Sequence, residues 1–97
     1  MYARVATGQV QPGKMDEFLR IYKETQRSIN EQTKGFQSAR ILTDSNTGKA
    51  VAVTIWETES DARASVSDSA LQDVTRRFGR VMAGAITTEI YEVSIDY

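Results

Sequence analysis

The sequence predicts an α+β domain in which four antiparallel strands and two helices follow one another in the order βαββαβ. Residues 50–56, Ala-Val-Ala-Val-Thr-Ile-Trp, form the most apolar stretch of the chain and carry the β-branched residues of a strand covered on both faces. Apolar residues recur at helical spacing on either side of this stretch, over residues 15–29 and 71–82. Residues 86–97 alternate between apolar and polar side chains, as half-buried strands do.

The first strand is expected over residues 2–10 and the first helix over residues 14–34. Pro12 separates them, because it has no amide proton to offer a strand partner but is tolerated in the first turn of a helix. Gly35 follows a basic last turn and suits the left-handed position that ends many helices. The residues expected on the inward face of this helix are Met15, Phe18, Leu19, Tyr22 and Ile29.

The second and third strands are expected over residues 36–43 and 50–56. The turn-forming residues 44–48, Asp-Ser-Asn-Thr-Gly, join them as an antiparallel hairpin. Thr58 and Asp61, three residues apart, have the spacing of a capping box and predict that a helix begins there.

The second helical region is expected over residues 60–83, in two parts. Ala62 and Val66 mark a short helix, and residues 67–69 interrupt it because Ser and Asp side chains compete for backbone hydrogen bonds. Gly84 is expected to cap the second part, whose apolar stripe consists of Leu71, Val74, Phe78, Val81 and Met82. The last strand, over residues 86–97, then places Tyr91, Val93, Ile95 and Tyr97 on one face.

This order of elements is the split βαβ arrangement of a ferredoxin-like sandwich. Right-handed crossovers place the first strand beside the third at the centre of the sheet, with both helices on one face. A chain of 97 residues has little material left to cover the other face. We therefore expect a homodimer in which two copies pack sheet on sheet.

The composition excludes several classes of function. A net charge of −1 gives no electrostatic reason to expect binding to nucleic acid or to an anionic membrane. The chain has no cysteine and no histidine, which excludes disulfides, thiolate or histidine metal sites, and histidine-dependent nucleophilic catalysis. Residues 1–6 lack the pattern of a signal peptide, and no apolar run is long enough to span a bilayer. A cytoplasmic location is the resulting expectation.

Two segments carry a family resemblance. Gln11-Pro-Gly-Lys14 runs into Met15-Asp-Glu-Phe-Leu19 after the first strand, and Ile55-Trp-Glu-Thr-Glu-Ser-Asp-Ala62 closes the third strand. In order and spacing, residues 1–97 resemble a single domain of the antibiotic biosynthesis monooxygenase-like (ABM) family. That family lies within the dimeric α/β barrel superfamily, so the resemblance also implies a homodimer.

The resemblance bears on chemistry as well. Haem-degrading relatives pair the third-strand tryptophan with an asparagine on the first strand and a histidine shortly after the tryptophan. Here the first strand has no asparagine, and Ser65 and Val66 stand where that histidine would be, so the resemblance does not extend to haem degradation. Relatives that oxidise polycyclic phenols to quinones with no metal or flavin remain open, as do members without catalytic activity.

A candidate site follows from strand alternation. Trp56 shares a face with Ala50, Ala52 and Thr54, and these small side chains leave volume between the sheet and the helices. An apolar slot with a few polar groups suits a flat aromatic ligand, and a phenolate can pass an electron to dioxygen without a cofactor. The candidate substrate-binding residues are Trp56, Tyr22, Phe18, Phe78, Arg4 and Thr7.

Simpler interpretations stand beside this one. Core packing alone explains Trp56, Phe18 and Tyr22. Arg4 is either a pocket cation or a charge at the edge of the dimer, and burial in the dimer explains the face of Tyr91 and Tyr97. The chain is accordingly either a cofactor-independent monooxygenase or a non-catalytic homodimeric ligand-binding or regulatory protein. An RNA-binding sheet is disfavoured, because the third strand lacks the basic, glycine-containing motif of such sheets.

Overall fold

The computed structural model describes residues 1–66 and 76–97. The predicted order of elements is confirmed, apart from the part of the second helical region that lies outside these residues. The elements are β1 (Tyr2–Gln9), α1 (Met15–Ile21), a π-helix (Tyr22–Gln26), α2 (Arg27–Gln32), β2 (Phe36–Asp44), β3 (Lys49–Trp56), α3 (Glu59–Ser65) and β4 (Thr87–Glu92).

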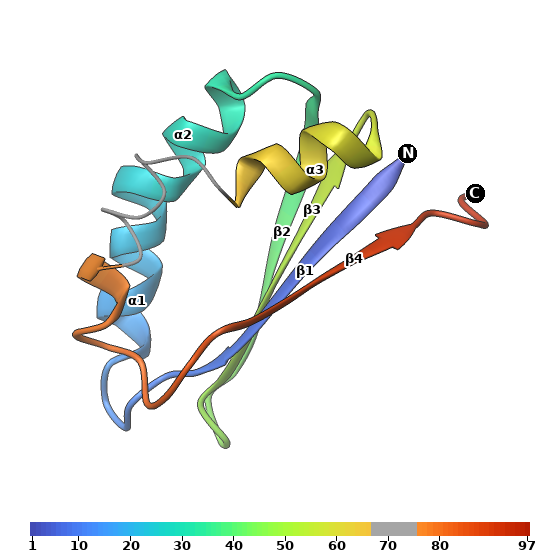
Figure 1. Ribbon diagram of the computed structural model, residues 1–97. Coiled ribbons are helices and arrows are strands. Elements are labelled where there is room, and N and C mark those ends of the chain that lie inside the picture. The colour runs from blue at the N-terminus through green and yellow to red at the C-terminus, as the bar shows by residue number, and fades with distance from the viewer. Residues whose placement is uncertain (67–75) are drawn as a thin grey trace.

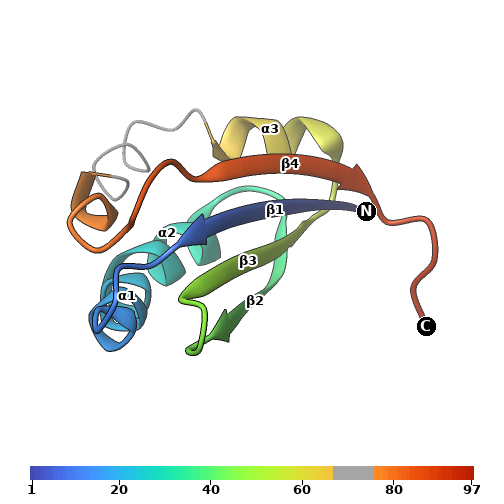
Figure 2. The ribbon, with the colours of Figure 1, turned by 90° about the horizontal axis from the view of Figure 1, so that it is seen from below.

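The strands form one antiparallel sheet in the order β2-β3-β1-β4, with β1 and β3 at its centre as predicted. Figure 1 shows α1, α2 and α3 on the same face of this sheet, and Figure 2 shows the strands side by side. The predicted α+β, ferredoxin-like fold is therefore confirmed.

Alternation along the strands divides the sheet into a covered face and an open face. Arg4 pairs with Thr54 and Ala6 with Ala52, so these residues share the face that the helices cover. No described helix covers the opposite face. We call it the open face, and its members include Val5, Thr7, Leu42, Val51, Val53, Ile55 and Tyr91.

The core lies between the covered face and the helices. The rings of Phe18 and Phe78 lie 5.4 Å apart, and the predicted inward positions of the first helix contribute to the core. The buried cluster consists of Val10, Phe18, Ile21, Tyr22, Ala50, Phe78, Val81 and Met82.

The predicted helix caps at Gly35 and Gly84 are wrong, although both glycines have a positive φ. The helix α2 ends at Gln32 and is followed by Thr33 in an extended conformation, and the later helical residues end at Phe78.

The signals at the hairpin turn and at the start of α3 were accurate. Gly48 has a φ of 78°, and the Asp44 carboxylate accepts the Asn46 amide proton at 2.9 Å within the hairpin turn. Thr58 precedes α3, and its hydroxyl accepts the Asp61 amide proton at 3.1 Å. Side-chain capping of this kind satisfies an amide group that the first turn of a helix leaves unpaired.

The helical segments differ from the prediction in two ways. The first helix contains the π-helical turn Tyr22–Gln26, which apolar spacing alone does not distinguish from α-helix. The helical residues that resume at 76 end at Phe78 rather than at residue 83, because Val10 pairs with Met82 in an isolated bridge. The predicted interruption at 67–69 and the predicted core positions Leu71 and Val74 lie outside the described residues.

The predicted last strand is too long. It was expected over residues 86–97, but β4 ends at Glu92, which pairs with Tyr2. The Val93 amide donates to the Met1 carbonyl at 2.9 Å, and no described residue pairs with the chain beyond that point. A strand extends only as far as its partner does.

In the described ranges, no helix is long and apolar enough to cross a membrane.

Candidate functional site

A cavity of about 120 Å³ lies between the covered face and the helical layer. An apolar cavity of similar size, about 150 Å³, is known to hold benzene in another protein, so the interior of this one has room for roughly one aromatic ring. The cavity is partly open, which leaves space for a larger ligand to extend out of it. From the strands, its lining includes Arg4, Ala6, Gly8, Ala50, Ala52 and Thr88. From the helical side and its loops come Phe18, Tyr22, Gln26, Val66, Phe78, Met82 and Ile86.

The floor of the cavity is empty for the reason that the sequence suggested. Ala6 and Gly8 on β1 lie beside Ala52 and Ala50 on β3, and none of them fills the space above the sheet. A Cβ atom on Gly8 would overlap the methyl end of Met82. The space therefore depends on small residues in two neighbouring strands.

The structure brings together four of the six predicted site residues. Arg4, Phe18, Tyr22 and Phe78 all line the cavity. Thr7 does not line it, because it pairs with Val51 on the open face of the sheet. β1 carries small or polar residues on both of its faces. The sequence alone therefore did not decide whether Arg4 or Thr7 would line the cavity.

Trp56 also stays outside the cavity lining. Its side chain is fully buried, its Nε1–H donates to the Thr54 hydroxyl at 2.9 Å, and the ring of Phe36 meets it edge-on at 5.6 Å. The guanidinium of Arg4 lies over the indole, 5.3 Å from the ring centroid. Trp56 thus supports Arg4 from beneath, and it is Arg4 that reaches the cavity.

Arg4 is a buried cation, with only 6% of its surface exposed. Its Nη1 donates to the Ser65 hydroxyl at 2.5 Å, and that hydroxyl donates in turn to the Ala62 carbonyl at 2.6 Å. Burial lowers the pKa of Arg4, and the electrostatic influence of Tyr22 raises it. Among the described residues, no carboxylate forms an ion pair with Arg4.

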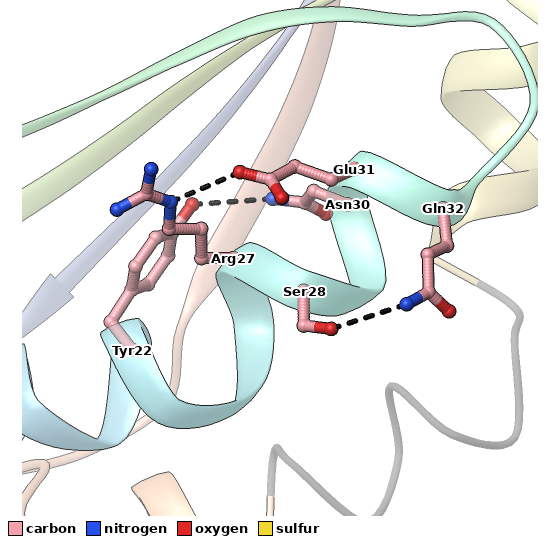
Figure 3. A network of polar contacts seen from close by, with 6 residues as sticks. All are labelled: Tyr22, Arg27, Ser28, Asn30, Glu31 and Gln32. Atoms are coloured by element: carbon pink, nitrogen blue, oxygen red, sulfur yellow. Dashed lines mark hydrogen bonds and ion pairs between the residues drawn. The ribbon is translucent and has the colours of Figure 1, made fainter.

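Tyr22 lies at the end of a chain of buried polar groups. The Gln26 amide donates to the Asn30 side-chain oxygen at 3.0 Å, and the Asn30 amide donates to the Tyr22 hydroxyl oxygen at 3.2 Å. Figure 3 shows the second of these contacts, with the Arg27–Glu31 ion pair beside it. Burial raises the pKa of Tyr22, and both Arg4 and the bond from Asn30 lower it.

The sequence contained a signal for this chain of polar groups that the prediction did not use. Gln26 and Asn30 follow Tyr22 at intervals of four residues, which keeps all three on or near one face of a helix. Each is at most 8% exposed. Amide side chains on an inward stripe need partners, so a network with Tyr22 was a natural expectation. The partners of Ser65 depend on tertiary contacts, although the sequence did place Ser65 and Val66 where haem-degrading relatives have a histidine.

Nothing in the described part of the chain suggests a metal centre, since no group of three Asp or Glu side chains is placed to hold one. The polar groups of the cavity are instead a guanidinium, a phenol, an amide and the Thr88 hydroxyl. Such a set can bind an oxygen-bearing ligand and exchange hydrogen bonds with it.

Comparison with known protein families identifies the relationship. The family model for antibiotic biosynthesis monooxygenases matches residues 1–77. The chain belongs to this family. The resemblance seen in the sequence is therefore confirmed, and the protein has the scaffold of an ABM-family monooxygenase.

Solved structures agree with this ABM assignment at the level of the fold. A monooxygenase of Streptomyces coelicolor in complex with nanaomycin D is similar with a TM-score of 0.83 and 15% identity, over 99% of this chain and 89% of the other. SnoaB, a cofactor-independent oxygenase from Streptomyces nogalater, gives 0.81 and 12%, over 98% and 94%. A conserved protein from Methanosarcina mazei gives 0.78 and 16%, over 93% and 89%. A search of curated protein sequences found no match.

Proposed function

We propose that this ABM-family protein is a small cofactor-independent monooxygenase that acts on an aromatic or polyketide-like molecule bound in the cavity. One observation carries the proposal: an apolar slot floored by alanine and glycine has a buried cation, Arg4, and a phenol, Tyr22, in its lining. Ligand sites in proteins are mostly apolar with a few well-placed polar groups. The related cofactor-independent oxygenase and the relative bound to nanaomycin D support the same assignment.

The chemistry requires little of the protein. An anthrone-type substrate loses two hydrogen atoms from its central carbon and gains one oxygen atom of dioxygen, while the second oxygen atom leaves as water. The deprotonated substrate itself supplies the electrons. The protein has only to bind the substrate, favour its anion and exclude bulk water. A mostly apolar, partly enclosed slot that contains a cation supports these tasks.

Dioxygen uptake tests this proposal. Wild-type protein is given a panel of anthrones, phenols and quinols, and the Ala52→Leu variant is assayed beside it. Leucine at this position fills the cavity floor, so uptake should fall steeply. Ala39→Leu is the matched control: Ala39 lies on the same face of the sheet, outside the cavity lining, and should leave uptake unchanged. Absence of uptake across the panel by folded wild-type protein would contradict the enzymatic function.

A second function uses the same cavity without turnover. A non-catalytic ligand-binding or regulatory protein is favoured by the absence of histidine and by a described lining that contains no carboxylate to act as a general base. An aromatic ligand that raises the melting temperature but consumes no dioxygen would support this function over the first.

We also propose that a second copy of the chain covers the open face. The central strands present Val5, Val51, Val53 and Ile55 there, and Leu42 on β2 is 53% exposed. An apolar strip of this kind along the central strands, with Arg40 and Glu89 beside it, is typical of a protein–protein interface. Because a two-fold symmetric contact uses the same surface twice, a flat sheet face suits it.

A further inference from the structure

We propose that Arg4 and Tyr22 form an oxyanion-binding pair, so that the cavity selects aromatic molecules in their anionic form over neutral molecules of the same shape. The inference rests on the proposed function only in placing the ligand in this cavity. Its substance concerns binding, and it holds for an enzyme and for a ligand-binding protein alike.

Arg4 has hydrogen-bond donors that its protein contacts leave unused. A guanidinium carries five N–H donors, whereas the described contacts of Arg4 are one hydrogen bond to Ser65 and the face of the Trp56 ring. No buried side-chain nitrogen or oxygen atom in the described ranges lacks a hydrogen-bond partner. The remaining donors of Arg4 are therefore those that the cavity leaves open, since Arg4 belongs to its lining.

The charge of Arg4 also favours an anionic ligand. A guanidinium removed from water is costly unless an opposite charge accompanies it, and none of the ion pairs among the described residues includes Arg4. Trp56 offers a partial substitute through its ring face, which attracts cations only weakly compared with a carboxylate. An anionic oxygen in the cavity would supply the missing charge.

The hydrogen bonds that reach Tyr22 run in one direction and leave its own proton free to be donated. Gln26 donates to Asn30, and Asn30 donates to the Tyr22 oxygen. The oxygen of Tyr22 therefore acts as an acceptor toward Asn30, and its own proton has no acceptor among residues 1–66 and 76–97. A phenol whose oxygen already accepts a bond is a better donor to the next group in the chain. Burial also raises the pKa of Tyr22, which keeps that proton in place near neutral pH.

The rest of the lining indicates the chemistry of the uncharged part of the ligand. Phe18, Phe78 and Met82 provide apolar contacts, and alanine and glycine form the floor. The described lining contains neither Asp nor Glu, so nothing there would attract an amine. Aromatic carboxylates, acidic phenols and enols share the chemistry that this arrangement recognises, namely a flat apolar body that ends in a charged oxygen.

The test compares 2-naphthoate with 2-naphthamide, which has nearly the same shape and no charge. Binding to wild-type protein is measured by titration calorimetry, and the side-chain Nε–H signal of Arg4 is followed by NMR. Because hydrogen bonds to charged groups are stronger than neutral ones, naphthoate should bind roughly tenfold to a hundredfold more tightly. Naphthoate should also shift the Arg4 signal, and naphthamide should not.

Variants separate the two partners. Arg4→Met keeps a flexible apolar side chain over Trp56 and should bring the two affinities together, while Tyr22→Phe should reduce the preference for naphthoate without abolishing it. Arg20→Met is the matched control, because Arg20 is exposed on α1, outside the cavity lining, and should leave the preference unchanged. If Arg4→Met does not fold, the wild-type preference, the Arg4 signal and Tyr22→Phe still decide the question.

Equal affinities for the two probes in wild-type protein would overturn the inference. So would a preference for naphthoate that persists in Arg4→Met, or one that leaves the Arg4 signal unmoved. Dioxygen uptake separates this result from the proposed function. Uptake without a preference for anions would retain the enzyme and remove the oxyanion pair, whereas a preference without uptake would do the reverse.

Discussion

The guanidinium of Arg4 lies 5.3 Å from the ring centroid of Trp56, and the two side chains are 6% and 0% exposed. A charged group and the largest aromatic residue of the chain therefore share one buried position on the covered face. Replacing Trp56 by alanine would remove the support of Arg4 and open a large void, at a cost of about 3–5 kcal/mol. Loss of activity in such a variant would not distinguish chemistry from folding.

The hydrogen bond from the Trp56 indole to the Thr54 hydroxyl can be tested with a smaller change than removal of the whole tryptophan side chain. Thr54→Val keeps the shape of the side chain but leaves the indole N–H without an acceptor, so the free energy of unfolding should fall by about 1–3 kcal/mol. In a Trp56→Phe background, which has no indole N–H, the same substitution should cost clearly less. Urea denaturation of wild-type protein, the two single variants and the double variant, all at the same protein concentration, measures this difference in unfolding free energy. Equal costs in the two backgrounds would show that the bond contributes nothing.

The raised pKa of Tyr22 predicts a loss of stability in alkali. Burial holds the pKa in the folded protein above the ordinary value of 10.0, so the unfolded chain ionises first as the pH rises. The stabilising effect is complete below pH 10.0 and is lost as the pH rises through the higher pKa of the folded state. Tyr22→Phe should therefore flatten the decline in unfolding free energy above that pH, relative to wild-type protein.

Tyr2→Phe is the comparison for Tyr22→Phe. A hydrogen bond to Glu92 raises the pKa of Tyr2 too, but this contact is exposed and water screens the interaction. Removal of the Tyr2 hydroxyl should change the alkaline slope less than removal of the Tyr22 hydroxyl. If the two variants had equal slopes, burial of Tyr22 would not be the cause.

Two glycines with similar backbone angles should respond differently to alanine. Gly13 and Gly35 have φ values of 78° and 84°, which is unfavourable for a residue with a side chain, at about 1–2 kcal/mol. Open space surrounds a Cβ atom at Gly13, whereas one at Gly35 would overlap the carboxylate of Asp61 at the start of α3. Gly35→Ala should lower the melting temperature more than Gly13→Ala. A smaller or equal effect at Gly35 would mean that α3 moves away freely.

The open face can be tested with two neighbouring residues of β2. Leu42 pairs with Val51 on the open face and Thr43 pairs with Ala50 on the covered face, and both side chains are exposed in the single chain. Leu42→Asp should shift the protein toward monomer in analytical ultracentrifugation, because an unpaired carboxylate is costly in an apolar interface. Thr43→Asp should leave the oligomeric state of the protein unchanged. A monomeric wild-type protein at micromolar concentration would contradict the proposed dimer.

The periodicity of apolar residues in the sequence predicted which face of a helix or strand many side chains would take. Helical spacing placed Phe18 and Tyr22 inward, and alternation placed Ala50, Ala52, Thr54 and Trp56 on one face, because both patterns are local and repeat along the chain. The turn at Gly48 and the cap at Thr58 were also readable, since each depends on a few adjacent residues.

Tertiary structure decided the features that depend on contacts between elements distant in the chain. The pairing of β1 with β3 placed Arg4 rather than Thr7 at the cavity, and the start of β1 at Tyr2 set the end of β4 at Glu92. The Arg4 guanidinium lies over the Trp56 ring. The Asn30 amide donates to the Tyr22 hydroxyl across a helical segment that contains the π-helical turn. A local pattern fixes which face a side chain takes, but only the elements packed against that face determine whether it ends in a cavity, under another side chain or at an exposed surface.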